Sequence, residues 1–89
     1  MANHVSAVKR AKQNEKRRVR NRHVISTCRT LVKKVRAALD ASDTGAADAA
    51  LLAATRAIGA AASKGILHKN NASRRIGRLA SAVATLKKG

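Results

Sequence analysis

The chain has 89 residues, of which 20 are Lys or Arg and only four are Asp or Glu, so its formal net charge is +16. A chain of this length forms one small domain with a thin core, and an excess of like charge opposes its folding, so a polyanionic partner is expected. Phe, Tyr and Trp are absent, which excludes the aromatic platform that usually holds single-stranded nucleic acid.

The distribution of charge divides the chain into three parts. Residues 1–39 and 64–89 are strongly basic, whereas residues 40–63 hold three of the four acids and a single base. Ala, Lys, Arg and Leu predominate and Pro is absent, so helix is favoured throughout. We predict an all-α fold in a single domain, residues 1–89, with helices over about 6–39, 45–63 and 69–86. Short connections imply an antiparallel up-down-up three-helix bundle.

The second half of the first predicted helix has an apolar face. Its apolar residues recur at helical spacing and cover about 140° of the helix surface, the width of a core-facing stripe. These residues are Val24, Ile25, Cys28, Leu31, Val32, Val35, Ala38 and Leu39.

The first half of this helix contains a basic run over residues 9–22. Eight of these fourteen residues are Lys or Arg, Glu15 is the only acid, and Ala11 and Val19 are the only apolar residues. No core face survives, so this long basic helix should project beyond the bundle. Like charges four residues apart oppose helix formation, so we expect the run to fray when free and to become ordered among phosphates. Glu15 should pair with Arg18 or Lys12 within the helix.

The predicted second helix follows a turn over residues 40–45. Ser42, Asp43 and Thr44 all suit the N-cap position, and Asp48 should favour the positive end of this helix. Its inner face is predicted from the helical spacing of Ala47, Leu51, Ala54, Thr55, Ile58 and Ala62. The many Ala residues allow close approach of a neighbouring helix.

The connection over residues 64–71 is basic and contains a helix stop. Gly65 suits the left-handed position after a helix, with Ile66 packing back. His68 could bind a phosphate or a 2′-hydroxyl, or simply be exposed. Asn70 and Asn71 are better explained as helix caps than as RNA ligands.

The third predicted helix has its own buried stripe. Its members are Ala72, Ile76, Leu79, Ala80 and Val83. Arg74 and Arg78 should point to the opposite side, where they are available to a polyanion.

Catalytic and metal-dependent functions find no support in the sequence. His4, His23 and His68 lack ligand spacing, and one Cys cannot build a structural zinc site, so we expect no metal and no cofactor. No phosphate-binding loop or nucleophile motif is present, and we predict neither an enzyme nor a small-molecule substrate.

Two other functions share the basic composition. A DNA-compacting protein would bind duplex DNA at least as tightly as structured RNA. A membrane-surface binder needs bulky apolar residues beside its bases, and residues 9–22 lack them. No apolar run of the length of a signal peptide or a membrane span is found.

Two blocks of the sequence resemble a known family. Residues 2–10 (Ala-Asn-His-Val-Ser-Ala-Val-Lys-Arg) and 13–22 (Gln-Asn-Glu-Lys-Arg-Arg-Val-Arg-Asn-Arg) resemble the opening of the S-twenty family of bacterial small-subunit ribosomal proteins. Residues 64–70 (Lys-Gly-Ile-Leu-His-Lys-Asn), with Ala72, Arg74, Arg78 and Leu79, are similar to that family's second signature. The resemblance runs from end to end.

The resemblance implies a function and a set of RNA ligands. The function is that of a structural constituent of the small ribosomal subunit, in the cytoplasm, which binds 16S ribosomal RNA directly and stabilises its folded helices during assembly. No membrane partner and no homo-oligomer are expected. The RNA ligands carried over from the family are Lys9, Arg10, Asn14, Lys16, Arg17, Arg18, Asn21, Arg22, Lys64, His68, Lys69, Asn70, Arg74 and Arg78. Charge adds Lys12, Arg20, Arg29, Lys33 and Arg75 to this predicted set.

Overall fold

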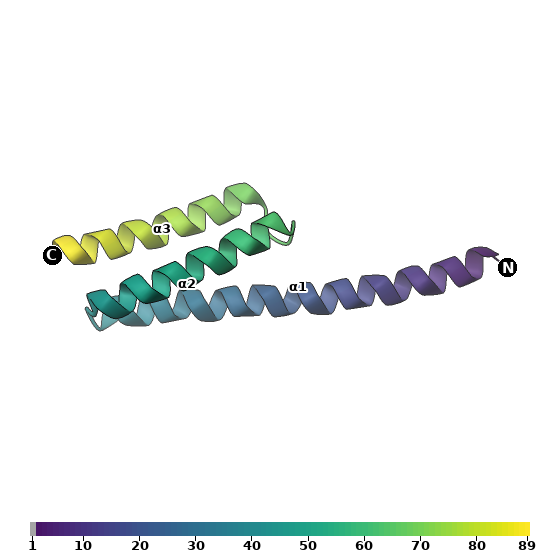
Figure 1. Cartoon of the computed structure of the whole chain (residues 1–89), viewed down its shortest axis with the longest axis horizontal. Helices are drawn as coiled ribbons and strands as arrows, with labels where there is room; N and C mark the ends of the chain where they lie inside the picture. The colour runs from purple at the N-terminus through teal and green to yellow at the C-terminus, as the bar shows by residue number, and fades with distance from the viewer. Residues whose placement is uncertain (1) are drawn as a thin grey trace.

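In the part of the chain that the structure describes, three helices are joined by two short turns. A computed structural model describes residues 2–89, with side chains from residue 6 onward; Met1 of the predicted domain and the side chain of His4 lie outside this part. The helices are α1 (Ala2–Asp40), α2 (Thr44–Ser63) and α3 (Lys69–Lys88) (Figure 1). The described residues contain no strand, so the predicted all-α fold class is confirmed. Helix α1 begins four residues before the predicted position and α3 extends two residues beyond it.

The three helices run up, down and up. Helices α1 and α3 both pack along α2, and their own contact with each other is much smaller. The first half of α1 extends past the other two helices (Figure 1). The molecule therefore measures 67 × 21 × 13 Å with a radius of gyration of 17.8 Å, whereas a compact chain of this length has about 12 Å. The predicted projection of the first helix is confirmed.

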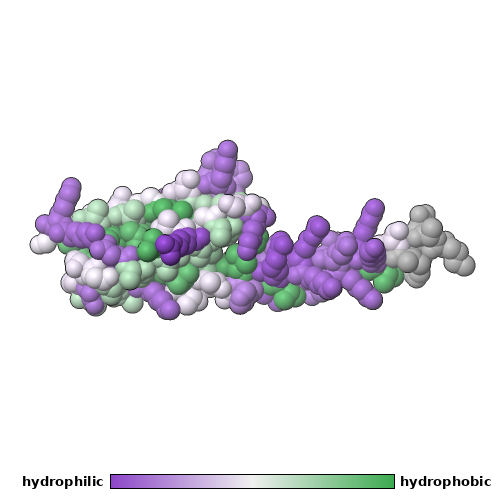
Figure 2. Space-filling view, viewed as in Figure 1, coloured by the Kyte–Doolittle hydropathy of each residue, from purple (hydrophilic) through white to green (hydrophobic). Residues whose placement is uncertain are grey.

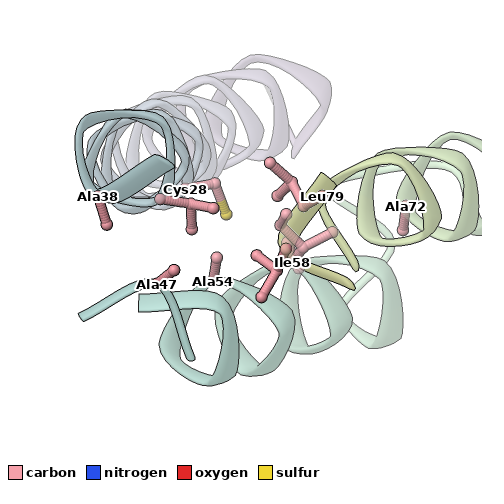
Figure 3. Packing of buried hydrophobic residues seen from close by; sticks show 10 residues of the cluster. Cys28, Ala38, Ala47, Ala54, Ile58, Ala72 and Leu79 are labelled. Atoms are coloured by element: carbon pink, nitrogen blue, oxygen red, sulfur yellow. The ribbon is translucent and has the colours of Figure 1, made fainter. Parts of the chain in front are cut away.

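A narrow core joins the C-terminal half of α1 to α2 and α3. Cys28, Ile58 and Leu79 come from the three different helices and point into the space between them (Figure 3). The buried residues are Cys28, Val35, Ala38, Ala47, Ala54, Ile58, Ala61, Ala72, Leu79 and Val83. Half of them are Ala, so the helices approach closely but each contact buries little apolar area.

The predicted apolar faces are correct for α1 and α3 and need one addition in α2. Every residue of the predicted α1 and α3 stripes is buried or half-buried. In α2 the buried residues are Ala47, Ala54, Ile58 and Ala61, of which Ala61 was not predicted, whereas the predicted Ala62 is half-buried. Ala54, Ile58 and Ala61 follow the i, i+4, i+7 spacing of one helical face. In a run of three Ala residues, the side-chain types alone do not distinguish which one faces inward.

Helix α1 ends at a turn that also starts α2. Ser42 has a left-handed backbone (φ 53°), and the N–H of Asp43 donates to the carbonyl of Ala38 at 3.0 Å, which closes the last turn of α1. The Asp43 carboxylate accepts from the N–H of Ala46 at 3.0 Å. Asp43 is therefore the N-cap among the three predicted candidates.

The role predicted for Asp48 in α2 is wrong. Asp48 was expected to interact with the positive end of the helix, but it lies beyond the first turn, where the effect of the helix dipole has faded. Its Oδ1 atom instead lies 2.8 Å from Nζ of Lys87, at the other end of the chain.

The turn between α2 and α3 has the predicted glycine geometry. Gly65 has φ 77°, and the N–H of Ile66 donates to the carbonyl of Ala61 at 2.9 Å. Because side chains other than Gly disfavour this φ, Gly65 fixes where α2 ends. Ile66 packs against the core cluster, as predicted.

Cys28 is a core residue. Its side chain is 2% exposed. Burial raises the pKa of the Cys28 thiol, and the nearby positive charge of Arg75 opposes this increase.

Within the described part of the chain, none of the helices has the length and apolar character needed to cross a bilayer.

Candidate nucleic-acid interface

The first half of α1 is a rod with cations on every side. We call residues 6–22 the basic arm; all of its residues are exposed except Asn21, which is half-buried. Even Val19 is 55% exposed, so no side of the arm is reserved for packing. Figure 2 shows hydrophilic side chains along the arm, whereas the apolar surface is concentrated on the bundle.

The arm makes few interactions that neutralise its charge. Arg18 Nη2 lies 2.9 Å from Oε1 of Glu15, which confirms one of the two partners predicted for Glu15. Arg20 donates from Nε and Nη2 to the Asn21 side-chain oxygen at 3.3 and 3.2 Å. In the described chain, the other seven bases of residues 9–22 form no ion pair. The arm therefore presents almost its whole charge to a partner.

One side of α1, from the arm to the start of the bundle, carries a shallow open groove of about 700 Å³ between long side chains of this single helix. It is lined by Asn14, Arg17, Arg18, Asn21, Arg22, Ile25, Ser26 and Arg29. From Asn14 to Arg29 the groove follows α1 for about 22 Å at 1.5 Å per residue. Guanidinium groups bind phosphate oxygens through two parallel hydrogen bonds, and the amides supply both donors and acceptors. This side of the arm suits the sugar–phosphate backbone of a nucleic acid.

A second basic region lies at the root of the arm. The turn between α2 and α3 lies at the end of the bundle from which the arm projects (Figure 1), and Lys64, Lys69 and Asn70 are exposed there. The fold thus brings the predicted residues 64–70 to the same end of the bundle as the arm (Figure 1).

His68 has a structural role in this second region. Its Nδ1 accepts from the N–H of Asn70 at 3.1 Å, so His68 is the N-cap of α3. An accepting Nδ1 leaves the ring proton on Nε2, which is available to a phosphate or a 2′-hydroxyl. The capping role predicted for Asn70 or Asn71 is therefore wrong. Asn70 lies inside α3, and Asn71 accepts from Arg75 Nε at 2.7 Å.

The remaining predicted ligands lie along the bundle. Arg29 and Lys33 are exposed on α1, and Arg74, Arg75 and Arg78 are exposed on α3. Arg29 also lines the groove that begins in the arm, whereas the other four lie on the bundle beyond the arm and its root.

Arg36 is an exposed cation that was not among the RNA ligands predicted from the sequence. It lines a cleft between α1 and α3 together with Val32, Arg75, Arg78 and Leu79. The sequence did indicate that Arg36 shares a helix face with two predicted ligands, because Arg29, Lys33 and Arg36 follow one another at i, i+4 and i+7 on α1.

The sequence matches one family over nearly its whole length. The family model described as Ribosomal protein S20 matches residues 2–84. The chain belongs to the ribosomal protein S20 family. The family suggested by residues 2–22 and 64–79 is thereby confirmed.

Individual relatives cover the chain equally well. A protein of Geotalea uraniireducens (strain Rf4) is 58% identical over 86 residues, which are 97% of this chain and 99% of the relative. A protein of Geobacter sulfurreducens is 52% identical over the same shares, and one of Anaeromyxobacter sp. (strain K) is 52% identical over 94% of this chain and 92% of its own. All three are named small ribosomal subunit protein bS20.

Proposed function

We propose that this chain is a structural component of the small ribosomal subunit that binds 16S ribosomal RNA directly. The family is one of structural ribosomal constituents, so the chain is not an enzyme, and its place is with the ribosome in the cytoplasm. The observation that carries direct RNA binding is the basic arm, whose cations face every direction and, in the described chain, have one carboxylate partner.

The proposed mechanism follows from the distribution of positive charge around the arm. A rod with cations around its circumference lowers the repulsion between phosphates on more than one side at once. RNA helices that repel one another can then approach on both sides of the arm, which stabilises their folded arrangement during assembly. Each phosphate contact releases condensed counterions, so the affinity should fall steeply with salt.

The RNA ligands of this proposal are the predicted set. The arm and the turn at residues 64–71 lie at the same end of the bundle (Figure 1), and the exposed bases of α1 and α3 continue along the bundle. Recognition would rest on backbone and shape, because phosphate contacts carry no sequence information and the chain has no aromatic residue. One copy acts alone in this proposal, since two chains of charge +16 repel each other.

The test compares two variants of equal charge. The arm variant combines Arg10→Gln, Arg17→Gln and Arg22→Gln. The control variant combines Lys34→Gln, Arg56→Gln and Lys88→Gln, which are outside the predicted set. Filter binding to 16S ribosomal RNA over a salt series should give the arm variant a slope of log K against log salt that is shallower by about 3, or about 1 per lost phosphate contact.

The control variant should keep a slope close to that of the unmodified chain. Equal slopes for the two variants would remove the arm from the interface. Duplex DNA that competes as well as 16S RNA would favour the DNA-compacting alternative and contradict the proposal.

A further inference from the structure

The cleft between α1 and α3 brings cations together from two helices. It has a volume of about 330 Å³ and is lined by Val32, Arg36, Arg75, Arg78 and Leu79; we call it the α1–α3 cleft. Arg36 lies on the α1 wall, and Arg75 and Arg78 lie on the α3 wall. Helices α1 and α3 otherwise touch much less than either touches α2, so this cleft occupies the weakest seam of the bundle.

The three arginines have no anionic partner in the described chain. The ion pairs there join Arg18 to Glu15 and Lys87 to Asp48. Like charges on facing walls repel each other, which opposes closure of the seam. Nothing in the packing requires this arrangement, since all three side chains are exposed.

Arg75 is already held in position. Its Nε donates to the Asn71 side-chain oxygen at 2.7 Å, and its charge is near enough to Cys28 to act on the thiol. The two terminal nitrogens of Arg75 remain available to a ligand. A guanidinium fixed through Nε loses less side-chain entropy when it binds a second group.

The floor of the cleft is apolar. Val32 is half-buried and Leu79 is 8% exposed. Arginine stems lie along such surfaces while the charged heads stay at the rim. An anion seated there is partly shielded from water, and its hydrogen bonds to guanidinium groups are strengthened.

We propose that a backbone phosphate of the bound RNA enters the α1–α3 cleft and bridges Arg36 of α1 to Arg75 and Arg78 of α3. This inference rests on the proposed RNA-binding function and adds to it a site on the bundle itself. The phosphate supplies the attraction that the seam lacks, so the RNA completes the packing of α1 against α3. The bundle is thus looser at this seam when free and tighter when bound.

The proposal makes opposite predictions for the free and the bound protein. A variant with Arg36→Gln and Arg78→Gln loses repulsion when free, so it should unfold at a higher urea concentration than the unmodified chain. The same variant should bind 16S RNA about tenfold more weakly at roughly 100 mM salt, the effect expected for hydrogen bonds to a charged group. Its salt slope should be shallower by about 2.

The matched control is a variant with Lys34→Gln and Arg56→Gln. It removes the same charge from α1 and α2, outside the cleft and outside the predicted RNA ligands. The rate of Cys28 modification by a thiol reagent gives a second readout, because Cys28 is buried beside the seam. Bound RNA should slow this reaction in the unmodified chain and in the control, but much less in the cleft variant.

The outcomes separate this inference from the proposed function. If the unmodified chain does not bind 16S RNA, both fail. If it binds, and the cleft and control variants share one affinity, one salt slope and one degree of Cys28 protection, the phosphate bridge is overturned while RNA binding by the arm stands. If the cleft variant loses its helical circular dichroism, a second variant that combines Arg36→Lys and Arg78→Lys is tested for its affinity for 16S RNA instead. Affinity equal to that of the unmodified chain would then overturn the guanidinium bridge.

Discussion

Lys87 and Asp48 form the ion pair that joins the end of α3 to the start of α2, with Nζ and Oδ1 2.8 Å apart. It is the sole ion pair between helices in the described residues. Both side chains are about half exposed, at 51% and 48%, so water and salt screen the attraction. The pair therefore contributes little to the stability of the fold.

Removal of this ion pair should have a small effect. We expect Asp48→Asn to lower the free energy of unfolding by at most about 1 kcal/mol at low salt, and the loss should become smaller near 1 M salt, where the screening length of about 3 Å is close to the separation of the two charges. Urea unfolding followed by circular dichroism measures this. Lys87→Gln should give a somewhat smaller loss, because it also removes one positive charge from a chain of net charge +16, and the double variant should give no further loss. Additive losses would show that the two residues act independently.

The two turns predict opposite effects of glycine exchange. Gly65 and Ser42 both have left-handed backbones, with φ 77° and 53°. We expect Gly65→Ala to lower the free energy of unfolding by about 1 kcal/mol, because a Cβ atom strains this conformation. Ser42→Gly relieves the same strain but makes the unfolded chain more flexible, so its net gain should be about 0.5 kcal/mol or less.

Gly77→Ala provides the control for this pair. Gly77 lies within α3, and a Cβ atom there would meet open space. The substitution should raise stability by roughly 0.5–1 kcal/mol because Ala favours helix. A destabilising Ser42→Gly, or a neutral Gly65→Ala, would contradict the description of the two turns.

Ile58 is the residue on which the core depends most. It is fully buried in the C-terminal half of α2, in the core to which all three helices contribute. We expect Ile58→Ala to cost about 2–5 kcal/mol, which is much of the total stability of a small domain. Thermal unfolding should show a broad transition at a far lower temperature.

Leu52 supplies the matched control on the outer side of the same helix. It is 53% exposed, so Leu52→Ala should change stability by less than about 0.5 kcal/mol. Equal effects at the two positions would mean that α2 faces the other helices through a different side.

The fold could be predicted because composition and spacing agree along the chain. Helix formers without Pro fixed the class, and the spacing from Val24 to Leu39 located the inner face of α1. Gly65 marked the end of α2 because only Gly adopts its backbone conformation easily. The left-handed Ser42 could not be predicted in the same way, since Ser has no preference for that region and takes it here because the helix end requires it.

The candidate interface could be predicted only in part. The arm could be predicted from the sequence, because eight bases in fourteen residues leave no side of the helix that could pack against a core. The α1–α3 cleft could not be predicted, because Arg36 and Arg78 are far apart along the chain and only the packing of the helices brings them to one cleft. Capping by His68 was also missed, since imidazole accepts at an N-cap less often than Asn, Asp or Ser.

The arm should change its helix content when it meets a polyanion. The structure shows α1 as helix from Ala2 onward, whereas repulsion between its like charges opposes that helix in free solution. We expect a peptide of residues 5–22 to be mostly unfolded at low salt, and its ellipticity at about 222 nm to become strongly negative with duplex RNA, because phosphates neutralise the bases and favour the ordered form.

A peptide of residues 44–63, which covers α2, serves as the control. It carries one base and one acid, so RNA should leave its ellipticity unchanged. Full helicity of the arm peptide at low salt without RNA would show that its helix needs no polyanion. In that case charge neutralisation would act on affinity alone, and the arm would enter the RNA as a preformed rod.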